Sequence, residues 1–142
     1  MELRIRRFDT TIPLPEYKTT GAAAMDLSAR IDLTIAPGAV VPVPLNVAIE
    51  PPPGHFVLLA ARSSLWKKGL HPINGIGVID QDYSGDGDEY HAMLRNFTDT
   101  PVDIKKGDRL VQIIVLPYEN ATLTEVENLG NTDRGPSGST GV

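Results

Sequence analysis

The 142-residue chain contains no cysteine. Disulfides and thiolate metal sites are therefore excluded, and the absence agrees with a cytoplasmic location, which is our expectation. No apolar run approaches the roughly 20 residues that a membrane-spanning helix needs, so we expect no membrane partner. Met1 to Arg4 lack the apolar region of a signal peptide, and we expect no secretion.

Positive charge is also in short supply. Thirteen Lys and Arg stand against eighteen Asp and Glu, which gives a formal net charge of −5. Non-specific nucleic-acid binding needs a basic face, so we expect no nucleic-acid partner. An anionic small substrate is still compatible with the composition, because local Lys and Arg side chains can gather around it.

Helix signals are few, whereas turn signals are many. Ser63–Lys68 predicts a single helical turn, with Ser63 or Ser64 as its N-cap and Gly69 as its end. Twelve prolines and thirteen glycines divide the rest into short β-rich runs, several of which alternate apolar and polar residues. We expect strands at residues 3–8, 25–28, 31–35, 39–43, 46–50, 54–60, 75–79, 90–96, 102–104, 108–117 and 123–126.

Many short strands between turns predict an all-β fold, a single barrel or sandwich over residues 1–129. The length suits one domain that buries roughly two thirds of its unfolded surface. Residues 130–142 are rich in Gly, Ser and Thr and have little to bury, so we expect them to form a flexible tail.

The chain is organised around the stretch Gly77–Gly85. A short apolar run ends directly before Asp80, Tyr83 follows three residues later, and a Gly-containing turn ends the stretch. We expect the strand end to desolvate Asp80 partly, so that its carboxylate can hold or deprotonate a water. Tyr83 offers a flat face to a ring-shaped substrate. The alternative is an ordinary strand that runs into a polar turn.

The segment Ala61–Gly69 has the features of a phosphate site. The hydroxyls of Ser63 and Ser64 lie at the start of a short helix, and Arg62 can bond bidentately to phosphate or carboxylate. Plain N-capping is the alternative. Trp66 is expected to be a packing residue.

Three more polar residues are candidates for a site. Asp26 lies between small and apolar neighbours, Asn74 offers a donor and an acceptor as a base edge demands, and Gln112 interrupts an apolar run. Each has a structural alternative: a hydrogen-bonded turn Asp, an Asn-Gly hairpin turn and a satisfied core Gln.

Two segments carry clustered polar residues. Asp86 to Glu89 contains three acids, and because a complete calcium-loop spacing is missing we favour a solvated turn. Residues 133–141 combine glycines and hydroxyls with Arg134, as loops that wrap phosphates do. A disordered tail is the alternative.

Taken together, these segments resemble the five ordered motifs of the trimeric dUTPase family. The motifs correspond to residues 21–27, 62–69, 74–85, 107–112 and 133–141. The resemblance implies a dUTPase-like β-barrel or jelly roll that assembles as a homotrimer with sites at the subunit junctions. It also implies hydrolysis of dUTP to dUMP and pyrophosphate with Mg²⁺ on the triphosphate, which limits uracil in DNA and supplies dUMP for dTMP synthesis.

The resemblance also implies roles for single residues. Asp80 would be the general base that orients the water attacking the α-phosphate. Asn74, with main-chain groups such as Gly77, would read uracil, and Tyr83 would lie against deoxyribose and leave no room for a 2′-OH. Catalysis would also involve Asp26, which positions the water shell of the metal, and Gln112. The phosphate-binding residues would be Arg62, Ser63, Ser64 and Gln112, with Arg134, Ser139 and Thr140 closing over the γ-phosphate.

The chain departs from the family pattern at two places. The tail is shorter than usual, so that Ser137 replaces an aromatic residue and Arg134 falls out of register. Loss of a base–aromatic stack can cost about 1–3 kcal/mol. Ser84 stands where Arg is frequent, and the turn after Tyr83 is lengthened by residues 86–88, which we interpret as a longer hairpin away from the chemistry.

Two other functions are open at this point. A dCTP deaminase, possible on the same fold, would need a glutamate that activates water, and Glu89 is the nearest candidate. A regulator that binds nucleotide without turnover is the third hypothesis, motivated by the missing tail aromatic.

Overall fold

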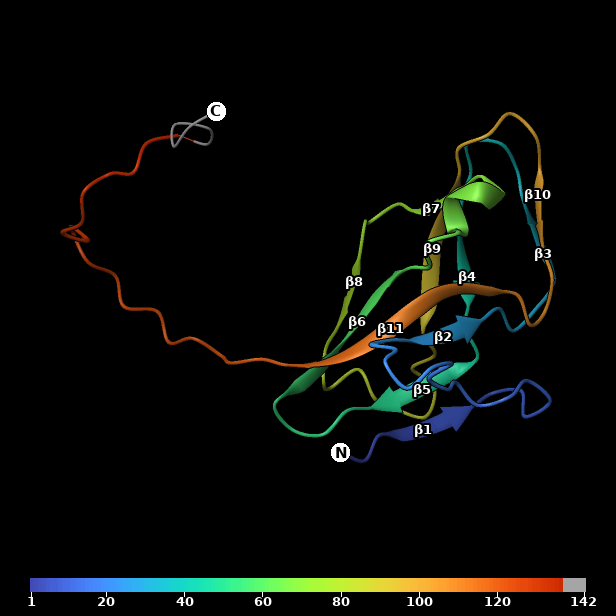
Figure 1. Ribbon diagram of the computed structural model, residues 1–142, viewed down its shortest axis with the longest axis horizontal. Helices are drawn as coiled ribbons and strands as arrows, with labels where there is room; N and C mark the ends of the chain where they lie inside the picture. The colour runs from blue at the N-terminus through green and yellow to red at the C-terminus, as the bar shows by residue number, and fades with distance from the viewer. Residues whose placement is uncertain (137–142) are drawn as a thin grey trace.

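The computed structural model (Figure 1) describes residues 1–136. Within that part the regular structure is β apart from one 3-10 helix, so the all-β prediction is confirmed. The strands form four antiparallel sheets. They are β1 (Arg4–Arg7) with β5 (Val47–Glu50); β3 (Leu33–Ile35) with β10 (Val102–Ile104); β4 (Val40–Pro44), β9 (His91–Asn96) and β7 (Leu70–Pro72); and β2 (Met25–Ser28), β11 (Arg109–Pro117), β6 (His55–Ala61) and β8 (Gly77–Ile79).

The sheet β2-β11-β6-β8 positions most of the candidate site. Its inner face supplies core residues such as Leu27, Val57 and Ile113, and all four sheets contribute to one hydrophobic cluster. Along β11 and β6 the residues facing the core alternate with residues facing away, as the two-residue period of a strand requires.

A β-bulge interrupts the pairing of β11 with β2. Arg109 lies opposite Ser28, whereas Val111 already lies opposite Leu27, so Leu110 is the extra residue. Leu110 and Val111 are therefore both buried although they are neighbours in the chain. The side chain of Arg109 returns to the outer face of the sheet, which is the kind of re-aiming that bulges produce.

The outer face of this sheet is apolar over β6, β8 and the second half of β11. Phe56 and Leu58 on β6 and Ile114 and Leu116 on β11 are half-buried, and Val78 on β8 is 61% exposed. An antiparallel sheet in water usually presents polar residues on its free face. The apolar outer face therefore has the composition of a covered surface.

The predicted helical turn is present as the 3-10 helix η1 (Leu65–Lys68). Gly69 ends it in the left-handed conformation, with φ 81°, as expected. Ser64 occupies the N-cap position, as expected, although its side chain makes no capping hydrogen bond. The packing role of Trp66 is wrong, because this side chain is 63% exposed. In residues 1–136 no helix has the length and apolar character needed to cross a membrane.

Two strand predictions differ from the structure. Strand β7 was missed because it is short and ends at Pro72, and it forms by pairing with β9. Residues 123–126 form no strand, and Leu123 is 92% exposed because nothing in the described part of the chain, residues 1–136, packs against it. After β11 the chain leaves the sheets (Figure 1), and regular structure is absent from residue 118 to residue 136. The boundary at residue 129 stays a prediction.

We predict that Gly69→Ala destabilises the protein by about 2 kcal/mol or more, because a non-glycine residue is strained in the left-handed region. Its Cβ would also collide with Cγ2 of Thr98, which cannot retreat freely because Thr98 is hydrogen-bonded to Asn96. Urea denaturation measures the loss. Gly87→Ala is the matched control, since a Cβ there meets nothing within 4 Å, and equal midpoints for the two variants would contradict the prediction.

Candidate functional site

Three of the predicted motifs meet on the outer face of the sheet around Asp26. The side chain of Asp26 is 16% exposed, and its Oδ2 lies 3.1 Å from Nε of Arg62 and 3.3 Å from a terminal nitrogen of Arg109. Gln112 lies opposite Asp26 in the strand register and donates from Nε2 to the carbonyl of Ala61 at 2.9 Å. The structure thus brings together Asp26, Arg62 and Gln112, as the motifs suggested.

Arg109 is the member of this cluster that sequence reasoning missed. An arginine is a typical ligand for phosphate, so its residue type could have marked it as a candidate. Its side chain, however, reaches Asp26 only because of the bulge at Leu110. Arg62 is also fixed, because it donates to the carbonyl of Arg109 at 3.1 Å. Two guanidinium groups share one carboxylate, so the cluster keeps a net positive charge that suits a phosphate or carboxylate ligand.

The two serines lie directly after Arg62. Ser63 is exposed and Ser64 is half-buried. Neither hydroxyl takes part in a hydrogen bond within residues 1–136. Both are therefore available to a ligand bound by Arg62.

Asp80 and Tyr83 lie on a second surface, at the far end of β8. They line one pocket of about 300 Å³ together with Val78 and Glu89. Asp80 is exposed, which differs from the expected partial desolvation, because nothing among residues 1–136 of the same copy covers the end of β8. Asp80 also borders a second pocket of about 460 Å³, formed with Phe56 and Tyr118.

Asn74 lies in an exposed turn between β7 and β8. Gly75 adopts φ 76° and its N–H donates to the carbonyl of Pro72. The alternative of an Asn-Gly hairpin turn is wrong, because β7 pairs with β9 whereas β8 pairs with β6, so the turn connects two sheets. At Gly77 a Cβ would lie 3.2 Å from Cβ of Leu59, so this glycine allows β8 to approach β6 closely.

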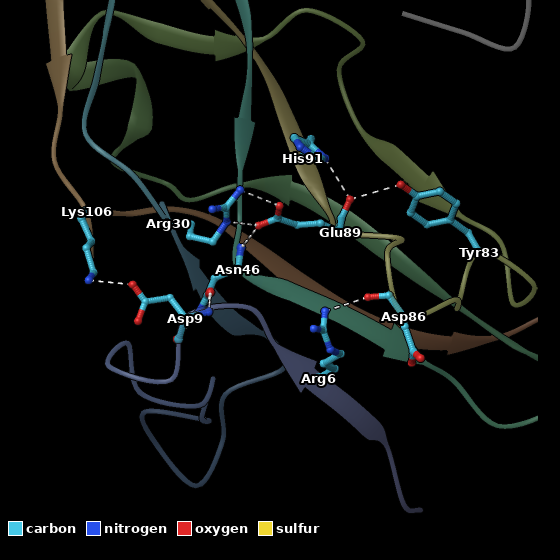
Figure 2. Close-up of polar contacts among 9 residues, drawn as sticks. All are labelled: Arg6, Asp9, Arg30, Asn46, Tyr83, Asp86, Glu89, His91 and Lys106. Atoms are coloured by element: carbon cyan, nitrogen blue, oxygen red, sulfur yellow. Dashed lines mark hydrogen bonds and ion pairs between the residues drawn. The ribbon is translucent and has the colours of Figure 1, made fainter.

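Glu89 has a role that the sequence did not reveal. Its carboxylate is buried and accepts two hydrogen bonds from Arg30, at 2.7 and 3.0 Å, and one from the main-chain N–H of Asn46 at 2.9 Å. Figure 2 shows this pair beside Tyr83 and His91. A carboxylate held in this way is not free to activate a water, which argues against the deaminase hypothesis.

The turn at residues 86–88 is not a hairpin either, because β8 and β9 lie in different sheets. Oδ2 of Asp88 accepts from the N–H of Gly85 at 2.8 Å, and Arg6 donates to the carbonyl of Asp86 at 2.8 Å. The turn is thus tied to itself and to β1. It also lies next to Tyr83, closer to the candidate site than we expected.

The two groups of candidate residues are far apart within one chain. Ile79 lies opposite Val57, which lies opposite Val115, whereas Gln112 lies three residues earlier on β11. Asp80 is therefore displaced from Gln112 by four residues, roughly 13 Å along the strands, and by two strand spacings of about 4.8 Å. A general base must lie within about 3 Å of the water it activates. One copy of the chain cannot bring both groups to the same phosphate.

Comparison with known proteins identifies the family. The family model described as dUTPase matches residues 10–141 of this chain. The chain belongs to the dUTPase family. It is 40% identical to the deoxyuridine 5'-triphosphate nucleotidohydrolase of Dictyoglomus turgidum over 97% of both chains. It is 42% identical to that of Desulfitobacterium hafniense over 96% of this chain and 92% of the relative. The resemblance predicted from the motifs is confirmed.

Solved structures agree with this membership. The dUTPase of Streptococcus mutans is 33% identical and superposes with a TM-score of 0.76, covering 83% of this chain and 98% of that chain. The dUTPase of Staphylococcus bacteriophage 80alpha, solved with dUPNHPP, reaches a TM-score of 0.86 over 99% of both chains at 21% identity. The latter likeness shows that the fold is shared.

Members of the dUTPase family typically use Mg²⁺. In residues 1–136 no three His, Cys, Asp or Glu side chains are grouped so that they could hold a metal ion. Mg²⁺ at phosphate-transfer sites keeps several waters and binds through one or two carboxylates and the substrate phosphates. A single partly buried carboxylate, Asp26, beside the two arginines Arg62 and Arg109 fits this mode of binding.

The tail of this dUTPase family member is only partly described. Arg134 is exposed in the part of the chain after β11. Ser137, Ser139 and Thr140 lie outside the described residues. Their roles stay predictions from the sequence.

We predict that Arg109→Met weakens binding of inorganic triphosphate at least tenfold, because a charge-assisted hydrogen bond is worth about 1.5–3 kcal/mol. Isothermal titration calorimetry measures the affinity. Arg95→Met is the matched control, since Arg95 is an exposed arginine on β9 in another sheet. Equal affinities for the two variants would remove Arg109 from the anion site.

Proposed function

We propose that this chain is a dUTP diphosphatase whose Asp80 activates the water that attacks the α-phosphate of dUTP, releasing dUMP and pyrophosphate. Membership of the dUTPase family and about 40% identity over nearly the full length of curated dUTPases support the reaction. The observation that carries the residue assignment is the pocket that Asp80 shares with Tyr83. An acid and an aromatic ring on one wall suit a water and a sugar bound side by side.

The chemistry asks for charge neutralisation and alignment more than for covalent help. In our proposal Arg62 and Arg109 neutralise phosphate charge, and Ser63 and Ser64 donate hydrogen bonds to phosphate oxygens. Gln112 orients its amide beside them, fixed by its bond to Ala61. Asp80 accepts a proton from the attacking water, and the pyrophosphate leaves in line with the attack.

Asp26 is the residue that would hold the metal, indirectly through water. Both arginine contacts are to Oδ2, so Oδ1 can accept a hydrogen bond from a metal-bound water. When bound, Mg²⁺ supplies charge neutralisation of the triphosphate. The arginines keep Asp26 in one orientation, which is the contribution of the chain itself.

Base and sugar are read by the turn around β8 in this proposal. Asn74 and the main chain near Gly77 present donors and acceptors to the uracil edge, and the exposed position of Asn74 makes them accessible. Tyr83 lies against the deoxyribose and leaves no room for a 2′-OH.

We propose further that the protein acts as a homotrimer with each site shared between copies. The separation of Asp80 from Gln112 within one chain supports this, because both groups must reach one substrate. The apolar outer face formed by Phe56, Leu58 and Val78, with its neighbours on β11, supports association as well. The number of copies follows from the family resemblance, and closure by Arg134, Ser139 and Thr140 of a neighbouring tail is part of the same proposal.

We predict that Asp80→Asn lowers the rate of pyrophosphate release from dUTP with Mg²⁺ by at least 10²-fold, the usual contribution of a general base. The affinity for dUTP and the melting temperature stay close to those of the native protein, because Asp80 is exposed. Asp82→Asn, an exposed neighbour in the same turn, is the matched control. Near-native turnover by Asp80→Asn would refute the base assignment, and a silent native chain would favour the regulator hypothesis.

The shared site is tested by mixing two impaired variants, Asp80→Asn and Arg62→Met, after co-refolding at equal amounts. If the two residues come from different copies, about one quarter of the sites in random trimers contain both native residues, and activity returns to about that level. Arg62→Met mixed with Asp26→Asn is the control and regains nothing, because these two side chains contact each other within one copy and no mixed site contains both native residues. An absence of recovery in the first mixture as well would show that one copy supplies the whole site.

A further inference from the structure

Glu89 is a charged residue buried next to the proposed site. Its side chain is only 8% exposed, yet it forms a two-pronged ion pair with Arg30 and accepts from the N–H of Asn46. Removing a charge from water is costly, and a pair of this kind persists only when its geometry and hydrogen bonds are good. The carboxylate raises the pKa of the Arg30 guanidinium, so Arg30 stays charged.

The main chain of Glu89 contacts Tyr83 directly. Its carbonyl oxygen accepts a hydrogen bond from the Tyr83 hydroxyl at 3.2 Å, and Nδ1 of His91 lies 2.9 Å from the same oxygen. Figure 2 shows the Tyr83 and His91 side chains converging on this carbonyl, opposite the side on which Arg30 holds the carboxylate. The tip of the Tyr83 ring is therefore anchored to the residue that the ion pair fixes.

Tyr90, which follows Glu89 in the chain, packs against one face of the Tyr83 ring. The two rings stack with centroids 6.3 Å apart at an interplanar angle of 30°. Tyr90 is 1% exposed, and its main chain is bonded on both sides, from its N–H to Val47 and from Leu45 to its carbonyl. Glu89 and Tyr90 thus hold the edge and one face of the Tyr83 ring.

The segment that joins Tyr83 to Glu89 gives Tyr83 no comparable support. It is the five-residue turn at 84–88, which is largely exposed and is secured by Asp88 on Gly85 and by Arg6 on Asp86. The hydrogen bond from the Tyr83 hydroxyl to the Glu89 carbonyl joins the two residues that flank this turn. The position of the ring therefore depends on where Glu89 is held, and Arg30 and Asn46 hold it from the connections after β2 and after β4.

We propose that the Arg30–Glu89 ion pair, whose carboxylate is buried, is a positioning device for Tyr83 and thereby sets how strictly the site excludes ribonucleotides. The inference rests on the proposed function, in which Tyr83 leaves no room for a 2′-OH. Arg30 and Glu89 touch no substrate and act only through the Tyr83 ring. The ring excludes a 2′-OH only while it is held in place, and because a misplacement of about 1 Å can change a rate by about 10²-fold, a small displacement of the ring relaxes the exclusion measurably.

The test compares kcat/KM for dUTP and UTP, measured by pyrophosphate release, in Arg30→Lys. Lysine keeps the charge but loses the planar fork that bonds both carboxylate oxygens. We expect the dUTP/UTP ratio to fall about tenfold, mainly through a rise in kcat/KM for UTP. A purely structural role would lower both values in proportion and leave the ratio unchanged, which would overturn the inference.

Two control variants separate positioning from general effects. Arg95→Lys makes the same residue change at an exposed arginine near the end of β9, paired with β4 and β7 and away from the turn after Tyr83, and should keep the native ratio. Ile104→Val trims a buried side chain on β10 and gives a loss of stability without touching the network. A similar loss of ratio in either control would overturn the inference.

The experiment stays decisive if Arg30→Lys fails to fold. The double variant Arg30→Met/Glu89→Met removes both charges, and apolar replacement of a buried ion pair often leaves a protein as stable as before. It should show the same loss of ratio, and a native ratio would overturn the proposal.

Tyr83→Ala distinguishes this inference from the function on which it rests. If Tyr83→Ala leaves the ratio unchanged, the role of Tyr83 is wrong and the inference falls with it. If Tyr83→Ala abolishes discrimination while the Arg30 variants keep it, only the positioning role of the ion pair is wrong.

Discussion

The register in which β11 pairs with β2 and β6 is the constraint on which the rest of the site depends. It sets Gln112 opposite Asp26, and the bulge at Leu110 lets two neighbouring residues enter the core while Arg109 turns outward. A shift by one residue would exchange the two faces of the strand and move every polar member of the cluster. The arginine–carboxylate cluster that we propose as the anion site is therefore a consequence of strand pairing as much as of residue type.

In our proposal the same sheet leaves one copy of the chain incomplete as a catalyst. Its outer face is apolar over β6, β8 and the second half of β11, and the strand register keeps Asp80 well away from the arginine cluster around Asp26. In our proposal the association that covers the apolar face also brings the two halves of the site together. Burial of surface and assembly of the site would then be one event, so activity would require the oligomer.

Order around Tyr83 carries a cost in stability. The Arg30–Glu89 pair gives up hydration, and the hydroxyl of Tyr90 is buried without a hydrogen-bond partner among the described residues. Burial raises the pKa of that hydroxyl, so it stays protonated. Groups that lower the stability of the fold in this way concentrate at functional sites, where a fixed geometry is needed for function. Their gathering beneath one ring agrees with a positioning role.

The sequence by itself determined the all-β class, most of the strands, the turn that ends at Gly69 and membership of the family, because alternation, turn residues and motifs are properties of near neighbours in the chain. Only the tertiary structure decided what distant residues do to each other. It left Trp66 and Asp80 exposed, placed Asn74 between two sheets, and joined Arg30 to Glu89 and Asp26 to Arg109 across 59 and 83 positions. Such contacts depend on strand register and on a bulge, and both are settled by packing that no local pattern records.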